Sequence, residues 1–228
     1  MAPATARIRE VLALALAAAC SLLAACASTA APTVRQQAAG GGLVAVATAP
    51  AAPSGAWPYY GTRIEPTVAL PSFQLTDTGG APYRPSTRAA GRIVTLFFGY
   101  TACPDECPTT MADIAAALRE LPAAVRARVT TLFVTLDPAH DTAAVLRKWL
   151  DNFDTGFVGL SGPVATVDRD ALALGVPARP PTTDAAGTRT VDHGTQTLVF
   201  GPDGTARFVW SPETTVADIA HDLKQLAG

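Results

Sequence analysis

The chain has 228 residues and a formal net charge of −2, from 17 Lys and Arg against 19 Asp and Glu. This length suits one domain with additional segments, or two small domains. Because the charge is slightly negative and the basic residues form no cluster, we expect no nucleic-acid partner.

Residues 1–25 are predicted to be a signal peptide of the bacterial lipoprotein type. Arg7 and Arg9 precede an uncharged apolar run, 11–25, which is too short for a membrane span but suits a signal core. The run ends in Leu-Ala-Ala-Cys, so Cys26 is the expected lipidation site, with Cys20 as the rival site. An ordinary secretory signal is the alternative. A lipid on Cys26 would anchor the protein at the outer face of the bacterial cell membrane.

Residues 26–62 are predicted to be a flexible, lipid-anchored linker. The part 27–56 is rich in Ala, Gly, Pro, Ser and Thr, and it carries one charged residue, Arg35. Such a composition does not bury enough apolar surface to fold. The folded domain is expected over 63–228.

The first half of this domain alternates between strand and helix patterns. Residues 71–84 predict a β-hairpin with a Gly-Gly turn. The apolar run 93–98 predicts a strand buried on both faces. A helix is expected from residue 108, a second buried strand over 130–137, and a second helix over 142–153.

The second half predicts a short edge strand at 157–160 and a short helix over 166–175. A hairpin over 195–210 turns at Pro-Asp-Gly, and a last helix starts near residue 216. A βαβ unit followed by an antiparallel hairpin and a closing helix predicts an α/β sandwich of the thioredoxin type. It would have a central mixed sheet, flanking helices and an N-terminal hairpin.

Two cysteines lie between the first buried strand and the helix that follows it. At a helix N-terminus, free backbone N–H groups stabilise the thiolates of Cys103 and Cys107. A proline follows each cysteine, so both are expected to be extended, with Cys107 near the helix cap. The neighbouring acids Asp105 and Glu106 are expected to raise the thiol pKa values, although Asp105 could instead cap the helix.

The pair admits three interpretations: a structural disulfide, a redox couple, or two ligands of a metal site. An oxidising compartment favours a disulfide. Side chains four apart on a helix have Cβ atoms about 5–6 Å apart, whereas a disulfide needs about 3.5–4.5 Å. The three-residue spacer therefore favours a metal modestly over an unstrained disulfide.

A metal would need a further ligand, and the chain has three histidines. His221 is expected on the solvent face of the last helix, and His140 in a turn that it stabilises. His193 precedes a predicted strand and is a candidate third ligand. Two thiolates and one imidazole suit Cu(I), with Cu(II) or Zn(II) as alternatives.

Three motifs in this order resemble the Sco/SenC family of membrane-anchored copper proteins with a thioredoxin fold. They are "FFGYTACPDECPTTM" (97–111), "VTLDPAHDT" (134–142) and "VDHGTQTLVFGPDG" (191–204). The resemblance implies that Cys103, Cys107 and His193 bind copper. Where many family members have arginine, this chain has His140. Its lipoprotein-type signal also differs from the membrane helix of many relatives.

The resemblance further implies a role in maturing the binuclear copper site of cytochrome c oxidase subunit II, by copper delivery, by reduction of its cysteines, or by both. A periplasmic copper donor is a further expected partner. One alternative is a thiol–disulfide oxidoreductase that uses Cys103 and Cys107 as its redox pair. The other is a peroxiredoxin-like or structural domain with a disulfide.

Overall fold

The computed structural model describes residues 57–228. The predicted signal peptide, the predicted lipidation site Cys26 and most of the predicted linker lie outside the described residues. Within 57–228, no helix is both long enough and apolar enough to span a membrane.

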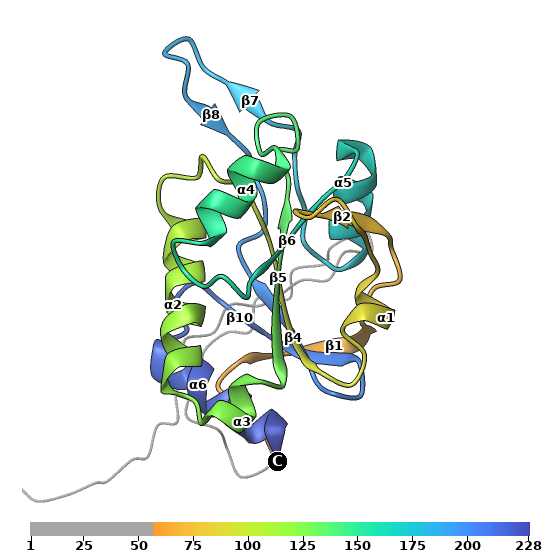
Figure 1. Cartoon of the computed structure of the whole chain (residues 1–228), viewed down its shortest axis with the longest axis vertical. Helices are drawn as coiled ribbons and strands as arrows, with labels where there is room; N and C mark the ends of the chain where they lie inside the picture. The colour runs from red at the N-terminus through yellow and green to blue at the C-terminus, as the bar shows by residue number, and fades with distance from the viewer. Residues whose placement is uncertain (1–56) are drawn as a thin grey trace, which may run out of the picture. The chain divides into compact units, whose positions relative to one another are not determined.

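A mixed sheet forms the centre of the domain. Its strand order is β1-β10-β9-β4-β5-β6-β2-β3, and the pairs β4–β5 and β5–β6 are parallel while the others are antiparallel. A separate two-stranded hairpin, β7–β8, projects from one end of the domain (Figure 1). The strands are β1 (Thr62–Ala69), β2 (Leu75–Asp77), β3 (Pro82–Tyr83), β4 (Ile93–Gly99), β5 (Val129–Thr135), β6 (Val158–Ser161), β7 (Thr182–Thr183), β8 (Arg189–Thr190), β9 (Thr197–Phe200) and β10 (Thr205–Trp210).

Helices cover both faces of this sheet. In Figure 1, α2, α4 and α6 lie on one side of the central strands and α1 and α5 on the other. The helices are α1 (Pro85–Arg88), α2 (Glu106–Glu120), α3 (Ala123–Arg126), α4 (Ala143–Leu150), α5 (Val164–Ala173) and α6 (Val216–Ala227). The predicted α/β sandwich is therefore confirmed.

The core explains why β4 and β5 occupy the middle of the sheet. Every residue of β4 is buried, and β5 is buried except for one half-buried residue, Thr130. Phe97 and Phe98 point to opposite faces of the sheet, and both are fully buried. A strand with apolar side chains on both faces is stable only between two helical layers.

The predicted elements are present with shifted ends. The helix expected from residue 108 begins at Glu106, and the strand expected over 130–137 ends at Thr135, because the chain then turns. The predicted edge position of 157–160 is wrong: β6 lies between β5 and β2, because the N-terminal hairpin β2–β3 pairs with it and forms the edge. Strand β1 and the hairpin β7–β8 were not predicted.

Candidate metal-binding site

Cys103 and Cys107 lie at the junction of β4 and α2. Asp105 is the N-cap residue and Cys107 is the second residue of the helix. The expectation that Cys107 is extended is therefore wrong. Pro108 is tolerated within the first helical turn because a proline there removes no intrahelical hydrogen bond. The capping role suggested for Asp105 is also wrong, since its side chain makes no cap hydrogen bond.

The sulfur of Cys107 lies in a space left by a glycine. A Cβ atom placed on Gly99 would be 2.9 Å from the Cys107 Sγ and 3.1 Å from the Phe133 ring. Cys107 is fully buried, whereas Cys103 is half-buried. Neither cysteine forms a disulfide, and the Cys107 backbone N–H donates to the Cys103 Sγ over 3.4 Å. Cys103 is therefore the sulfur within reach of a partner.

The two thiols differ strongly in acidity. A hydrogen bond from the Cys107 side chain, aided by backbone N–H groups of Cys107 and Asp105, lowers the pKa of Cys103 to about 5. The same hydrogen bond, together with burial, raises the pKa of the Cys107 thiol. Cys103 is thus a thiolate at neutral pH and Cys107 a thiol. The expectation that the acids Asp105 and Glu106 keep both pKa values high fails for Cys103, because hydrogen-bond donors dominate there.

His193 approaches these sulfurs from the segment that precedes β9. Its backbone forms an isolated β-bridge with Ala178, and its Nε2 lies 3.9 Å from the Cys107 Sγ. Its Nδ1 is 2.8 Å from the backbone oxygen of Gly194. Because a carbonyl oxygen only accepts, Nδ1 carries the proton, and the lone pair of Nε2 faces the sulfur.

These donors fit a thiophilic metal ion. Sulfur and nitrogen ligands on one ion at a trigonal angle would be about 3.7 Å apart, given bonds of about 2.3 and 2.0 Å. The Cys107–His193 separation of 3.9 Å is close to this value. Residues 57–228 contain no group of three or more His, Cys, Asp or Glu side chains already arranged to hold a metal. At least one of the three side chains would therefore have to move to complete the set.

Aromatic rings enclose the imidazole. The rings of Phe97 and Tyr100 meet the His193 ring edge to face, with centroids 6.2 and 6.0 Å away. Both aromatic residues are buried, so water has little access behind the imidazole. Sequence reasoning missed Tyr100 and Gly99 as parts of this site, although both directly follow the predicted strand.

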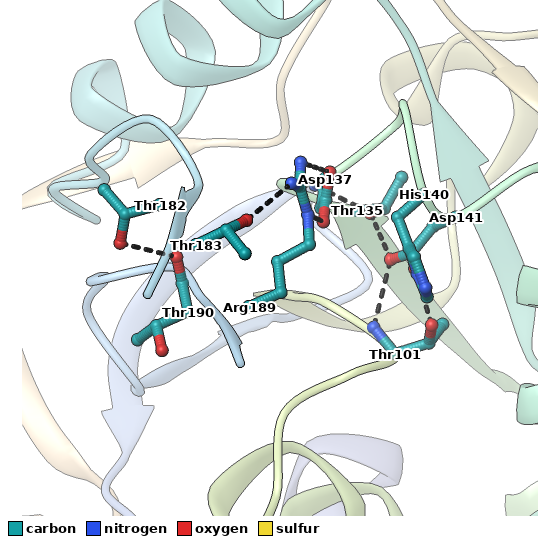
Figure 2. A network of polar contacts seen from close by, with 9 residues as sticks. All are labelled: Thr101, Thr135, Asp137, His140, Asp141, Thr182, Thr183, Arg189 and Thr190. Carbon is teal, nitrogen blue, oxygen red and sulfur yellow. Dashed lines mark hydrogen bonds and ion pairs between the residues drawn. The ribbon is translucent and has the colours of Figure 1, made fainter. Parts of the chain in front are cut away.

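The cysteine loop is held by a buried carboxylate of the turn after β5. Asp141 accepts from the backbone N–H of Thr101 over 3.0 Å and from its hydroxyl over 2.5 Å, and it also accepts from Thr135 (Figure 2). His140 places Nδ1 3.2 Å from Asp141, with its side chain 51% exposed. This agrees with the predicted turn role of His140 and gives no sign of a ligand.

His221 was expected on the solvent face of the last helix, and the structure places it there only partly exposed. Its ring packs edge to face on Tyr60 with centroids 4.9 Å apart, and its Nδ1 lies 3.2 Å from Asp222. The side chain is 36% exposed. The N-terminal segment that packs on α6 was not predicted, which explains the difference.

The fold and the thiol–imidazole site together define a thioredoxin-like protein with a soft donor set, and comparisons with known proteins agree. Residues 62–228 match the family model described as SCO1/SenC. The chain belongs to the SCO1/SenC family. It is 38% identical over 139 residues to a Stutzerimonas stutzeri protein described by its name as a candidate copper-binding protein, covering 61% of this chain and 67% of that protein.

Solved structures show the same likeness. Copper-bound ScoI from Bradyrhizobium japonicum has a TM-score of 0.62 and 31% identity, over 70% of this chain and 99% of that one. Apo Sco1 from Thermus thermophilus has a TM-score of 0.65 and 33% identity, over 74% and 96%. The structure of BsSco, 19% identical, is described as a member of the Sco family of cytochrome c oxidase assembly proteins. The chain spans between 30% and 67% of the length of the curated relatives that it matches.

Proposed function

We propose that this chain is an exported, lipid-anchored protein that binds one copper ion through Cys103, Cys107 and His193. It would deliver the copper to the binuclear site of cytochrome c oxidase subunit II, reduce the cysteines of that site, or do both. The observation that carries the proposal is the His193 Nε2 lying 3.9 Å from the Cys107 Sγ, with Nδ1 2.8 Å from the backbone oxygen of Gly194. The family membership and the copper-bound relative support copper as the metal.

Cu(I) is the favoured oxidation state, with Cu(II) as the alternative. Two sulfur donors and one imidazole prefer the softer ion. Transfer would then be a ligand exchange without electron transfer: a thiolate of the receiving protein binds the ion as one ligand of this chain leaves. The neutral imidazole of His193 is the ligand that can leave first, because no charge is separated. Cys103, the less buried sulfur, would leave last.

Anaerobic titration of the reduced protein with Cu(I) tests this function. We expect one copper per chain, loss of binding in Cys103→Ser and Cys107→Ser, and weaker binding in His193→Ala. His221→Ala is the matched control, because this imidazole lies on α6 against Tyr60 and Asp222, and it should bind like the parent. If Cys103→Ser binds copper as tightly as the parent, the proposed site is wrong.

A thiol–disulfide reductase is a second candidate, and the low pKa of Cys103 favours it. The Cys103 thiolate would attack a disulfide of an exported partner and release one partner thiolate. Cys107 would lose its proton and attack Cys103, which releases the second partner thiol and leaves a Cys103–Cys107 disulfide. Two electrons thus pass to the partner. Fast reduction of a model disulfide that does not change in His193→Ala would favour this function over copper transfer.

A further inference from the structure

Asp137 and Arg189 form a bidentate ion pair beside the candidate site. Asp137 follows β5, and its side chain is 1% exposed. The Arg189 Nη2 donates to Asp137 Oδ1 over 2.7 Å, and Nε donates to Oδ2. Figure 2 shows Arg189 reaching from the β7–β8 hairpin to Asp137. We call this pair the clasp.

Because Asp137 is buried, its carboxylate depends on the Arg189 guanidinium. An ionised carboxylate out of water needs a cation or several donors, and the two parallel N–H groups of a guanidinium match its geometry. Arg189 holds the pKa of Asp137 below its usual range, aided by the backbone N–H of His140. Removing the guanidinium leaves a buried charge without its counter-ion, so the Arg189 segment is strongly favoured to stay against the end of β5.

One member of the clasp, Arg189, lies on the segment that carries the His193 imidazole. Arg189 stands four residues before His193, and the intervening Val191 is buried. Beyond Val191, backbone hydrogen bonds attach the chain to the segment 177–179: the Arg179 N–H donates to Asp192 O and the Gly194 N–H to Pro177 O, each over 2.8 Å. The His193 segment thus has a backbone attachment on one side and the clasp on the other.

The turn 137–141, which contains Asp137, also holds the cysteine loop. Asp137 begins this turn and Asp141 ends it, since the backbone N–H of Asp141 donates to the backbone oxygen of Asp137 over 2.8 Å. Its carboxylate fixes Thr101, two residues before Cys103. The 137–141 turn therefore contacts both ligand-bearing segments through two buried carboxylates, and their separation depends on it.

We infer that Arg189 and Asp137 are positioning residues that hold His193 at the cysteine pair and so raise the affinity of the site for copper. This inference rests on the proposed function. Neither residue belongs to the proposed ligand set. Their effect comes from restricting the His193 segment before the ion arrives, because a ligand that is already in place loses less freedom on binding.

Copper affinity of Arg189→Gln tests the inference, with Arg179→Gln as matched control. Arg179 pairs with Asp192 on the same segment, but both side chains are more than three-quarters exposed, at 79% and 77%. We expect Arg189→Gln to weaken Cu(I) binding by on the order of tenfold, the lower end of the range for residues that orient metal ligands. Arg179→Gln should bind like the parent. Asp137→Asn/Arg189→Gln, which leaves no unpaired charge, guards against misfolding and should show the same loss.

A second background separates positioning from general stability. In His193→Ala, adding Arg189→Gln should cause no further loss of affinity, because the ligand that the clasp positions is gone. An equal loss in both backgrounds, or no loss in the parent background, overturns the inference.

A metal-free readout keeps the inference testable by itself. Amide hydrogen exchange at Gly194, whose N–H bonds to Pro177, should speed up in Arg189→Gln and not in Arg179→Gln. Unchanged exchange refutes the clasp. If instead exchange speeds up as expected but the parent binds no copper, the proposed function fails while the clasp remains as a structural feature of the His193 segment.

Discussion

Gly99→Ala is the sharpest test of how Cys107 is held. The added Cβ would lie 2.8 Å from the Phe97 ring, 2.9 Å from the Cys107 Sγ and 3.1 Å from the Phe133 ring. Ordinary contacts of a Cβ atom lie at 3.4–4 Å, so an ordinary contact requires the Cβ and the sulfur to move apart by 0.5 Å, the difference 3.4 − 2.9. These neighbours are buried, so they have little space in which to move.

The expected cost follows from overpacking. One methyl group forced into a filled core destabilises a protein by about 1–3 kcal/mol. For a domain of this size, that lowers Tm by roughly 2–12 °C. Because Cys107 belongs to the first turn of α2, its movement also displaces the proposed metal donor, and we expect Cu(I) affinity to fall by on the order of tenfold.

Urea denaturation and anaerobic Cu(I) titration measure the two effects separately. Gly156→Ala is the matched control: its Cβ would meet only the Asp154 carboxylate, at 3.1 Å, in an exposed turn. We expect this control to be close to the parent in both assays. If Gly99→Ala is as stable as the parent and binds copper equally well, the Cys107 sulfur does not occupy the space described above.

Three further predictions concern acidity and buried hydrogen bonds. Alkylation of Cys103 should follow a titration with a midpoint near pH 5, with the reactive thiolate above it, and Cys107→Ala should raise that midpoint; a midpoint near pH 9 in the parent contradicts the hydrogen-bond cause. At pH 7, copper binding should displace about one proton, from Cys107, because Cys103 is already ionised. Calorimetry in buffers of different ionisation enthalpy counts the released protons, and a count of two would refute the assignment of Cys103 as the thiolate. Thr101→Val removes the hydroxyl that donates to Asp141 over 2.5 Å, so the free energy of unfolding should fall by about 1.5–3 kcal/mol in urea, and an unchanged value would be inconsistent with this bond.

Sequence reasoning predicted the part of the site that has local patterns. The buried run of β4, the cysteines that follow it and the histidine before β9 each have a neighbourhood that can be read along the chain. The proximity of His193 to the cysteines followed from the family resemblance, and the structure brings its Nε2 to 3.9 Å from Cys107. That the three residues bind a metal stays a prediction.

The rest depends on contacts between distant residues. Arg189 and Asp137 are 52 positions apart, and nothing near either residue indicates the pairing. The two-residue strands of the β7–β8 hairpin are too short to produce an alternating pattern. Backbone N–H groups were expected to stabilise a thiolate and the nearby acids to oppose it, but the largest cause of the low pKa of Cys103, the hydrogen bond from the Cys107 side chain, was missed.

The antiparallel pairing of β4 with β9 has a consequence for biogenesis. It sets the start of β9 beside the end of β4, with Leu96 opposite Leu198, so the dithiol and the imidazole meet only after the C-terminal third has docked. During synthesis, the cysteines emerge some ninety residues ahead of the histidine. A nascent or truncated polypeptide therefore displays a bare dithiol, open to oxidation, and acquires the complete donor set only as its last strands close the sheet.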